Sequence, residues 1–76
     1  MPTLRLFSSA REAAGVDSDM VAGDTVEEVL DEASMRYGAA FIQVLAVSGV
    51  LINGEIADRS RQTEYNDEIV ILPLGT

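Results

Sequence analysis

The segment EIVILPL, residues 68–74, constrains the fold more than any other part of this 76-residue chain. As a strand it carries Ile69 and Ile71 on one face. Val70 and Leu72 lie on the other, so the strand is apolar on both faces. A strand of this kind normally lies in the middle of a sheet. We therefore expect a central strand within a few residues of the end of the sequence, where chains are usually polar and frayed.

The segment DTVEEVLDEASMRYG, residues 24–38, predicts the main helix. Thr25 and Glu28 form a capping box at its start, and Gly38 is suited to its end. One face is apolar at helical spacing, through Val26, Val29, Leu30, Ala33 and Tyr37.

The remaining segments give weaker signals. We expect a strand over 3–9, a loop or turn over 9–19, a short strand over 19–24, a helical turn or irregular buried segment over 39–49, a strand over 50–56 that enters an Asn53-Gly54 hairpin turn, and a polar connection over 57–67.

This order predicts a single α+β domain over residues 1–76, with one main helix on one face of a mixed sheet. The first strand is also apolar on both faces, because Leu4 and Leu6 point one way and Phe7 the other. We therefore place the first and last strands side by side and parallel at the centre. This is the ubiquitin-like β-grasp arrangement.

Composition excludes several kinds of chemistry. The chain has no cysteine, no histidine and no lysine, so it lacks the usual nitrogen and sulfur metal ligands and the base of a nucleophilic triad. Its carboxylates fall on a solvated helix face and in turns, and no glycine-rich phosphate loop follows a strand. We expect no cofactor, no metal and no catalysis by this chain alone.

Charge and hydropathy limit the partners. Thirteen acidic residues against five arginines give a net charge of −8, which disfavours nucleic acid and anionic membranes. The acidity favours a basic protein partner or serves solubility alone. No segment has the length of a membrane span or the pattern of a signal peptide, so the expected location is the cytoplasm.

An apolar patch remains on the sheet face that the main helix leaves open. Such a patch usually marks an interface, unless it is small or the 39–47 segment covers it. The predicted partner-binding residues are Phe7, Ile56, Val70, Leu72, Pro73 and Leu74.

Several segments resemble, in order, the small subunit of molybdopterin synthase. LRLFSSAREAAG is similar to its opening, DTVEEVLDEASMRYG to its helix, INGE to its Asn-Gly-Glu turn and NDEIVILP to its approach to the terminal strand. The thiamin-pathway sulfur carrier shares the fold but usually lacks the Leu-Phe and Arg-Glu opening.

The resemblance implies a sulfur carrier rather than an enzyme. In that family a ubiquitin-activating-type enzyme adenylates the C-terminal carboxylate, which becomes a thiocarboxylate. The tail then enters the large subunit of molybdopterin synthase and gives its sulfur to a pterin precursor. The implied partners are these two proteins. The alternatives are a carrier for another pathway, such as thiamin synthesis, and a ubiquitin-like binding module that has lost the carrier tail.

The end of the sequence departs from the family pattern. The family ends in Gly-Gly, whereas Leu74, Gly75 and Thr76 follow Pro73 here. Three explanations are open: the sequence stops short of the glycines, the carrier role has been lost, or a Gly75-Thr76 terminus is accepted. A carrier needs a tail that moves between active sites, so we expect residues 74–76 to be flexible, with Gly75 and Thr76 as the tail that partners recognise.

Overall fold

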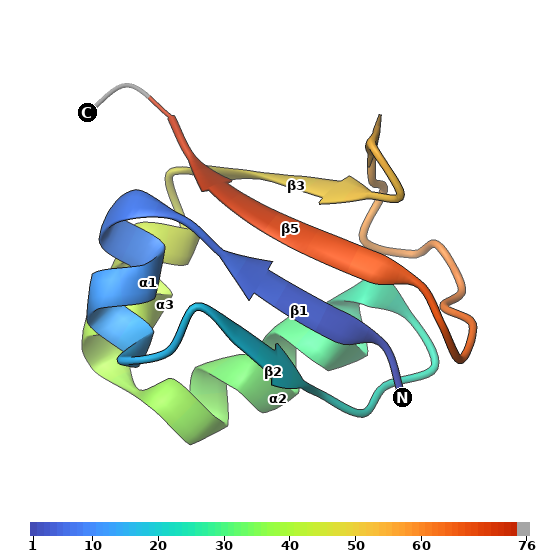
Figure 1. Cartoon of the computed structure of the whole chain (residues 1–76), viewed down its shortest axis with the longest axis horizontal. Helices are drawn as coiled ribbons and strands as arrows, with labels where there is room; N and C mark the ends of the chain where they lie inside the picture. The colour runs from blue at the N-terminus through green and yellow to red at the C-terminus, as the bar shows by residue number, and fades with distance from the viewer. Residues whose placement is uncertain (75–76) are drawn as a thin grey trace.

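Residues 1–74, the part of the chain that this computed structural model describes, form one sheet of five strands together with three helices (Figure 1). The strands are β1 (Thr3–Leu6), β2 (Ser18–Met20), β3 (Ser48–Ile52), β4 (Glu55–Ile56) and β5 (Glu68–Pro73). The helices are α1 (Ser8–Ala14), α2 (Val26–Tyr37) and α3 (Ala39–Leu45).

The centre of the sheet is the parallel pair of β1 and β5, as the two-sided apolar pattern predicts. The strand order is β2-β1-β5-β3-β4, and every other pairing is antiparallel. The parallel register runs from Thr3 opposite Glu68 to Leu6 opposite Ile71. β2 and β4 form the two edges. The predicted α+β class and β-grasp arrangement are therefore confirmed.

The helices all cover the same face of the sheet and leave the other face open (Figure 1). Leu4 and Leu6 of β1 point to the covered face and are 0% and 1% exposed. Each helix contributes to the single core beneath them, including Ala10 of α1, Leu30 of α2 and Phe41 of α3. No helix in residues 1–74 is both long enough and apolar enough to cross a membrane.

Thr25 is the N-cap residue of helix α2, as predicted, but the Glu28 half of the capping box differs by one residue. The Thr25 side-chain oxygen accepts a hydrogen bond from the backbone N–H of Glu28 at 3.2 Å. The Glu28 carboxylate reaches back to the N–H of Asp24 at 3.3 Å, one residue before the cap rather than to the cap itself. Both interactions satisfy donors that the helix leaves unpaired. The predicted apolar stripe is confirmed, with Val26 and Val29 fully buried.

The prediction of a loop over 9–19 is wrong for its first half, because residues 8–14 form α1. The apolar stripe of this short helix consists of alanines, of which Ala10 is fully buried and Ala13 and Ala14 pack against the core. Alanine has the highest helix propensity, so tertiary contact suffices to hold the helix. Gly15 ends it at φ 81°, where its N–H donates to the Arg11 carbonyl.

Other segments also differ in detail from the sequence-based expectation. The first strand ends at Leu6 instead of reaching residue 9, and β3 begins at Ser48 instead of residue 50. The 39–49 segment is helical over α3, with Phe41 and Leu45 in the core. β2 occupies residues 18–20 rather than 19–24, and Val21 after it is fully buried. The Asn53-Gly54 hairpin turn is present, with both residues at positive φ, and joins β3 to β4.

Candidate functional site

The open face of the sheet carries a row of side chains across four strands. Arg5 of β1 lies opposite Val70 of β5, Val70 lies opposite Leu51 of β3, and Leu51 lies opposite Ile56 of β4. Residues opposite each other share a face, so the row runs from a charged group near one edge to three apolar groups. Ile56 is 88% exposed, so most of its side chain is accessible for contact.

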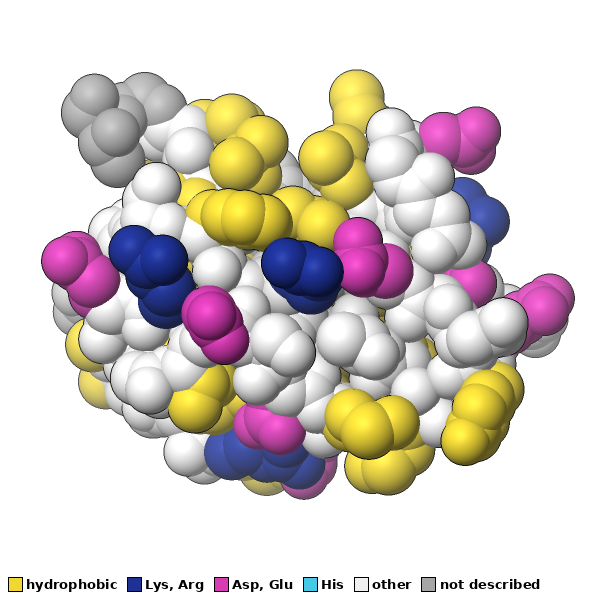
Figure 2. Space-filling model, viewed as in Figure 1, with side chains coloured by type: hydrophobic (Ala, Val, Ile, Leu, Met, Phe, Trp, Pro, Cys, Tyr) yellow, Lys and Arg dark blue, Asp and Glu magenta, His cyan; other side chains and the backbone are white. Residues whose placement is uncertain are grey.

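A second row lies nearer the C-terminal end of β5. Leu72 lies opposite Gly49 of β3, and one further step of the parallel register brings Phe7 beside Leu72. Leu74 continues the alternation and lies over Gly49. Phe7 and Leu72 are each 40% exposed, so the row is accessible to a partner. Hydrophobic side chains gather over β5 and β3 in this view of the open face (Figure 2).

We call Phe7, Leu51, Ile56, Val70, Leu72 and Leu74 the apolar face. Five of these six were predicted from the sequence. Leu51 was missed, although Val50, Leu51 and Ile52 show the same two-sided apolarity that identified β5.

Pro73 does not share this face. Its place in the alternation puts it on the helix-covered side with Ile69 and Ile71, and it lies opposite Ser48. The predicted tail residues Gly75 and Thr76 lie outside the described part of the chain. The expectation of flexibility over 74–76 stays a prediction.

Phe7 also occupies an unusual place in the local structure. It is the N-cap residue of α1, and its side chain makes no capping hydrogen bond. Serine, threonine, aspartate or asparagine at this position would stabilise the helix by about 1 kcal/mol relative to an apolar residue. Phe7 therefore supplies contact area at a position where helix stability favours a polar side chain.

Charged groups flank the apolar face. Arg5 and Glu68 approach within 3.6 Å across the β1–β5 pair, and both side chains are about half exposed. An exposed pair of this kind contributes little to stability. It offers a partner one positive and one negative group beside the apolar face.

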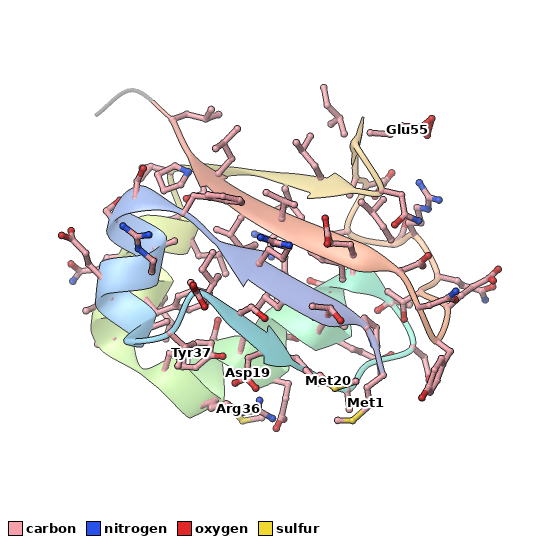
Figure 3. The ribbon with its side chains drawn as sticks, viewed as in Figure 1. Met1, Asp19, Met20, Arg36, Tyr37 and Glu55 are labelled. Atoms are coloured by element: carbon pink, nitrogen blue, oxygen red, sulfur yellow. The ribbon has the colours of Figure 1, made fainter. Side chains whose placement is uncertain are left out.

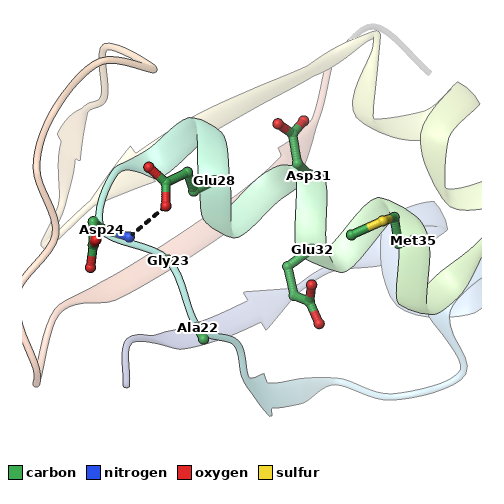
Figure 4. Close-up of a pocket in the computed structure, with 7 residues that line it drawn as sticks. All are labelled: Ala22, Gly23, Asp24, Glu28, Asp31, Glu32 and Met35. Carbon is green, nitrogen blue, oxygen red and sulfur yellow. Dashed lines mark hydrogen bonds between the residues drawn. The ribbon is translucent and has the colours of Figure 1, made fainter.

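The acidic side of α2 lies away from this face and forms a shallow depression (Figure 4). Asp24, Glu28, Asp31 and Glu32 line it together with Met35 and the backbone at Ala22 and Gly23. Residues 1–74 contain no group of three or more aspartate or glutamate side chains placed to hold a metal ion. The four carboxylates give this side of α2 a negative electrostatic field.

A cluster at the β2 edge joins the end of α2 to the sheet (Figure 3). The Tyr37 hydroxyl donates to the Asp19 carboxylate at 2.5 Å, and Arg36 donates to the same oxygen at 2.9 Å and to the Met20 carbonyl at 3.1 Å. The hydrogen bond from Tyr37, followed by that from Arg36, lowers the pKa of Asp19. Burial, followed by the bond to Asp19, raises the pKa of Tyr37 to about 12.

The contacts of this cluster indicate a structural role rather than a catalytic one. Arg36 and Asp19 occupy the outward-facing carbonyl and N–H of Met20, so they close part of the free edge of β2. A tyrosine with a raised pKa and an aspartate with a lowered one are poor proton carriers near neutral pH.

Taken together, the fold and the site define a small ubiquitin-like protein that presents an apolar sheet face beside the root of its C-terminal segment. The model of the ThiS family matches residues 4–76. The chain therefore belongs to the ThiS family, whose members are ubiquitin-like sulfur carriers, generally non-catalytic by themselves. The resemblance to this group of carriers is confirmed.

Solved structures support the same fold. The small archaeal modifier protein SAMP1 from Haloferax volcanii is 28% identical with a TM-score of 0.82, over 99% of this chain and 96% of that one. A putative molybdopterin converting factor, subunit 1, from Pyrococcus furiosus is 19% identical with a TM-score of 0.81, over 95% and 94% of the two chains.

A third similar structure comes from the BexX/CysO complex of Amycolatopsis orientalis. It is 20% identical with a TM-score of 0.84, over 100% of this chain and 98% of that one. At these identities the Pyrococcus and Amycolatopsis proteins support the fold alone. No curated protein sequence matches this chain.

Proposed function

We propose that this chain carries sulfur as a thiocarboxylate on its C-terminal carboxyl group and delivers it for synthesis of the molybdenum cofactor. The observation that carries the proposal is the family match over residues 4–76, which includes both the apolar face and the tail. The choice of pathway follows the resemblance of the opening, helix and turn segments to the small subunit of molybdopterin synthase.

The chemistry belongs to the partners, and the chain supplies the acceptor. On the adenylating enzyme, a carboxylate oxygen attacks the α-phosphorus of ATP and pyrophosphate leaves. A sulfur nucleophile then displaces AMP from the acyl adenylate. Because these steps consume ATP, we propose that the protein works in the cytoplasm.

The sheet positions the tail for this exchange. β5 pairs with β1 on one side and with β3 on the other, so its direction is fixed by two ladders. The strand up to Pro73 thus has a fixed position relative to the rest of the sheet. We propose that the large subunit of molybdopterin synthase docks on that face and takes the tail beyond Leu74 into its active site.

The acidic side of α2 suits recognition over longer range. Helix α2 faces away from the open sheet and carries four acidic residues and one arginine, so it holds −3 of the chain's net charge of −8. A basic surface on the adenylating enzyme would be steered toward it before the tail is engaged.

The central experiment measures thiocarboxylate formation. The chain, and a version with two glycines appended after Thr76, are incubated with the adenylating enzyme, ATP and a sulfur donor. Mass spectrometry then tests for replacement of one oxygen by sulfur. We expect the extended version to react, because its end matches the family pattern. Reaction of the original chain shows in addition that a Gly75-Thr76 terminus is accepted.

The outcomes separate the possible functions. Failure of the extended version with a cognate enzyme refutes the sulfur-carrier function and favours a ubiquitin-like binding module. Sulfur delivery to a thiamin-pathway enzyme, without delivery to the large subunit of molybdopterin synthase, assigns the carrier to the other pathway.

A further inference from the structure

The last described residue, Leu74, is held on the sheet. Its backbone N–H donates to the carbonyl oxygen of Val47 at 3.2 Å, which extends the β3–β5 ladder beyond the pair of Ser48 and Pro73. Its side chain lies over Gly49, where a Cβ atom would be 3.5 Å from Leu74 Cδ1 and 3.8 Å from Leu74 Cγ. These two interactions form a seat for Leu74 on β3.

The seat holds Leu74 weakly. A single hydrogen bond at the end of a ladder is easily lost to water. Gly49 offers no side chain, and Leu74 stays 57% exposed. In the free protein we therefore expect Leu74 to exchange between seated and released positions.

The backbone does not require glycine at position 49. Positive φ angles among the glycines occur at Gly15, Gly38 and Gly54, whereas Gly49 lies outside that group. A Cβ atom there would make ordinary van der Waals contacts, the closest at 3.5 Å. An alanine would thus fit and would add apolar contact beneath Leu74. The glycine keeps the seat shallow.

We propose that Val47 and Gly49 form a release seat: it holds Leu74 in the free carrier, lets go when the adenylating enzyme takes the tail, and has its strength set by Gly49. This inference rests on the proposed carrier function. Releasing Leu74 lengthens the free tail by about 3.4 Å, the span of one extended residue. It also frees the leucine side chain for contact with the enzyme.

The test is a double-mutant cycle of Gly49→Ala and Leu74→Ala. In the free protein, NMR measures hydrogen exchange at the amide of residue 74. We expect Gly49→Ala to slow exchange by about twofold to fourfold when Leu74 is present, because one methyl group gains contact. In the Leu74→Ala background the same change should leave exchange unaltered, since the contacting Cγ and Cδ1 atoms are gone. This background is the control for a general effect of alanine on β3.

The second readout is the kcat/KM of adenylation, measured on the Gly-Gly-extended versions of the same four proteins. A tighter seat should lower kcat/KM by about twofold to fourfold for Gly49→Ala, and only where Leu74 is present. Global stability, followed by urea unfolding, shows whether a variant alters more than the seat.

The results test the existence of the seat, its role in release and the carrier function separately. Unchanged exchange in Gly49→Ala, or equal slowing in both backgrounds, refutes the seat. Slower exchange with unchanged adenylation refutes its release role. Absence of adenylation in all four proteins refutes the proposed function and the release role with it, while the exchange data still decide whether the seat exists.

Discussion

Replacing Phe7 by aspartate should leave the domain folded and weaken partner binding. Phe7 is 40% exposed, so about 120 Å² of a side chain of about 200 Å² is buried. At about 25 cal/mol per Å², losing that burial costs at most about 3 kcal/mol. The new carboxylate lies at the N-cap of α1, where it stabilises the helix by about 1 kcal/mol. The net loss of about 2 kcal/mol lies below the total stability of about 4–11 kcal/mol expected for this length.

Binding should weaken measurably in a protein that stays folded. The exposed part of Phe7 lies beside Leu72, where a partner would exclude water from it. A buried aromatic anchor of this kind is worth about 2 kcal/mol or more, which is about 30-fold in Kd. Calorimetric titration against the large subunit of molybdopterin synthase measures the change, and circular dichroism follows unfolding in urea.

Tyr65→Asp is the matched control, because Tyr65 is an aromatic residue that is 79% exposed and lies outside the apolar face. It makes the same charge change and should bind normally. Wild-type affinity in Phe7→Asp would refute the docking assignment. Unfolding of Phe7→Asp in buffer would show that Phe7 is a core residue and that the burial estimate is wrong.

Three further predictions concern stability and association. Gly23→Ala should lower the urea midpoint by the equivalent of about 1–3 kcal/mol, because the added Cβ would lie 2.6 Å from the backbone nitrogen of Val29, whereas Gly49→Ala should not lower it. Asp19 has a lowered pKa, so its contribution to stability is present above the usual pKa of 3.8 and is lost as the pH falls below that value. Tyr37 has a pKa raised to about 12, so its contribution to stability is lost as the pH rises from about 10 to 12. Tyr37→Phe should flatten the alkaline limb of a plot of melting temperature against pH, and an unchanged limb would contradict this. The rate constant for association with the adenylating enzyme should fall at least tenfold as ionic strength rises from about 0.01 to 0.15 M. A rate constant from stopped-flow measurements that does not change with salt would mean that the acidic residues serve solubility alone.

The parts of the fold that were predictable have redundant local signals. α2 has a cap, an apolar stripe and a terminal glycine, and the hairpin has Asn53-Gly54. The central position of β5 follows from its two apolar faces. α1 was missed because its stripe is made of alanines and its N-cap residue is Phe7, so neither the hydrophobic period nor the cap signals a helix.

The residues of the candidate site likewise include some that the sequence predicts and some that only the structure reveals. Alternation alone places Val70 and Leu72 on one face, and the same rule, strictly applied, would have placed Pro73 on the other. Leu51 and Gly49 join the site only through the register of β3 against β5. That register depends on how the 39–49 segment returns to the sheet, which no local pattern specifies.

Departures from local preference are informative because stability alone does not explain them. Phe7 stands at a helix cap where a polar residue would stabilise more, and Ile56 is a β-branched apolar residue left 88% exposed on an edge strand. Both departures fall on the open face of the sheet. Gly49, a glycine in a strand whose backbone does not demand one, lies on that face too, under the root of the tail. All three residues therefore lie on the face where we propose that partners dock and Leu74 is released, and contact with a partner is the role that we propose for Phe7 and Ile56 there.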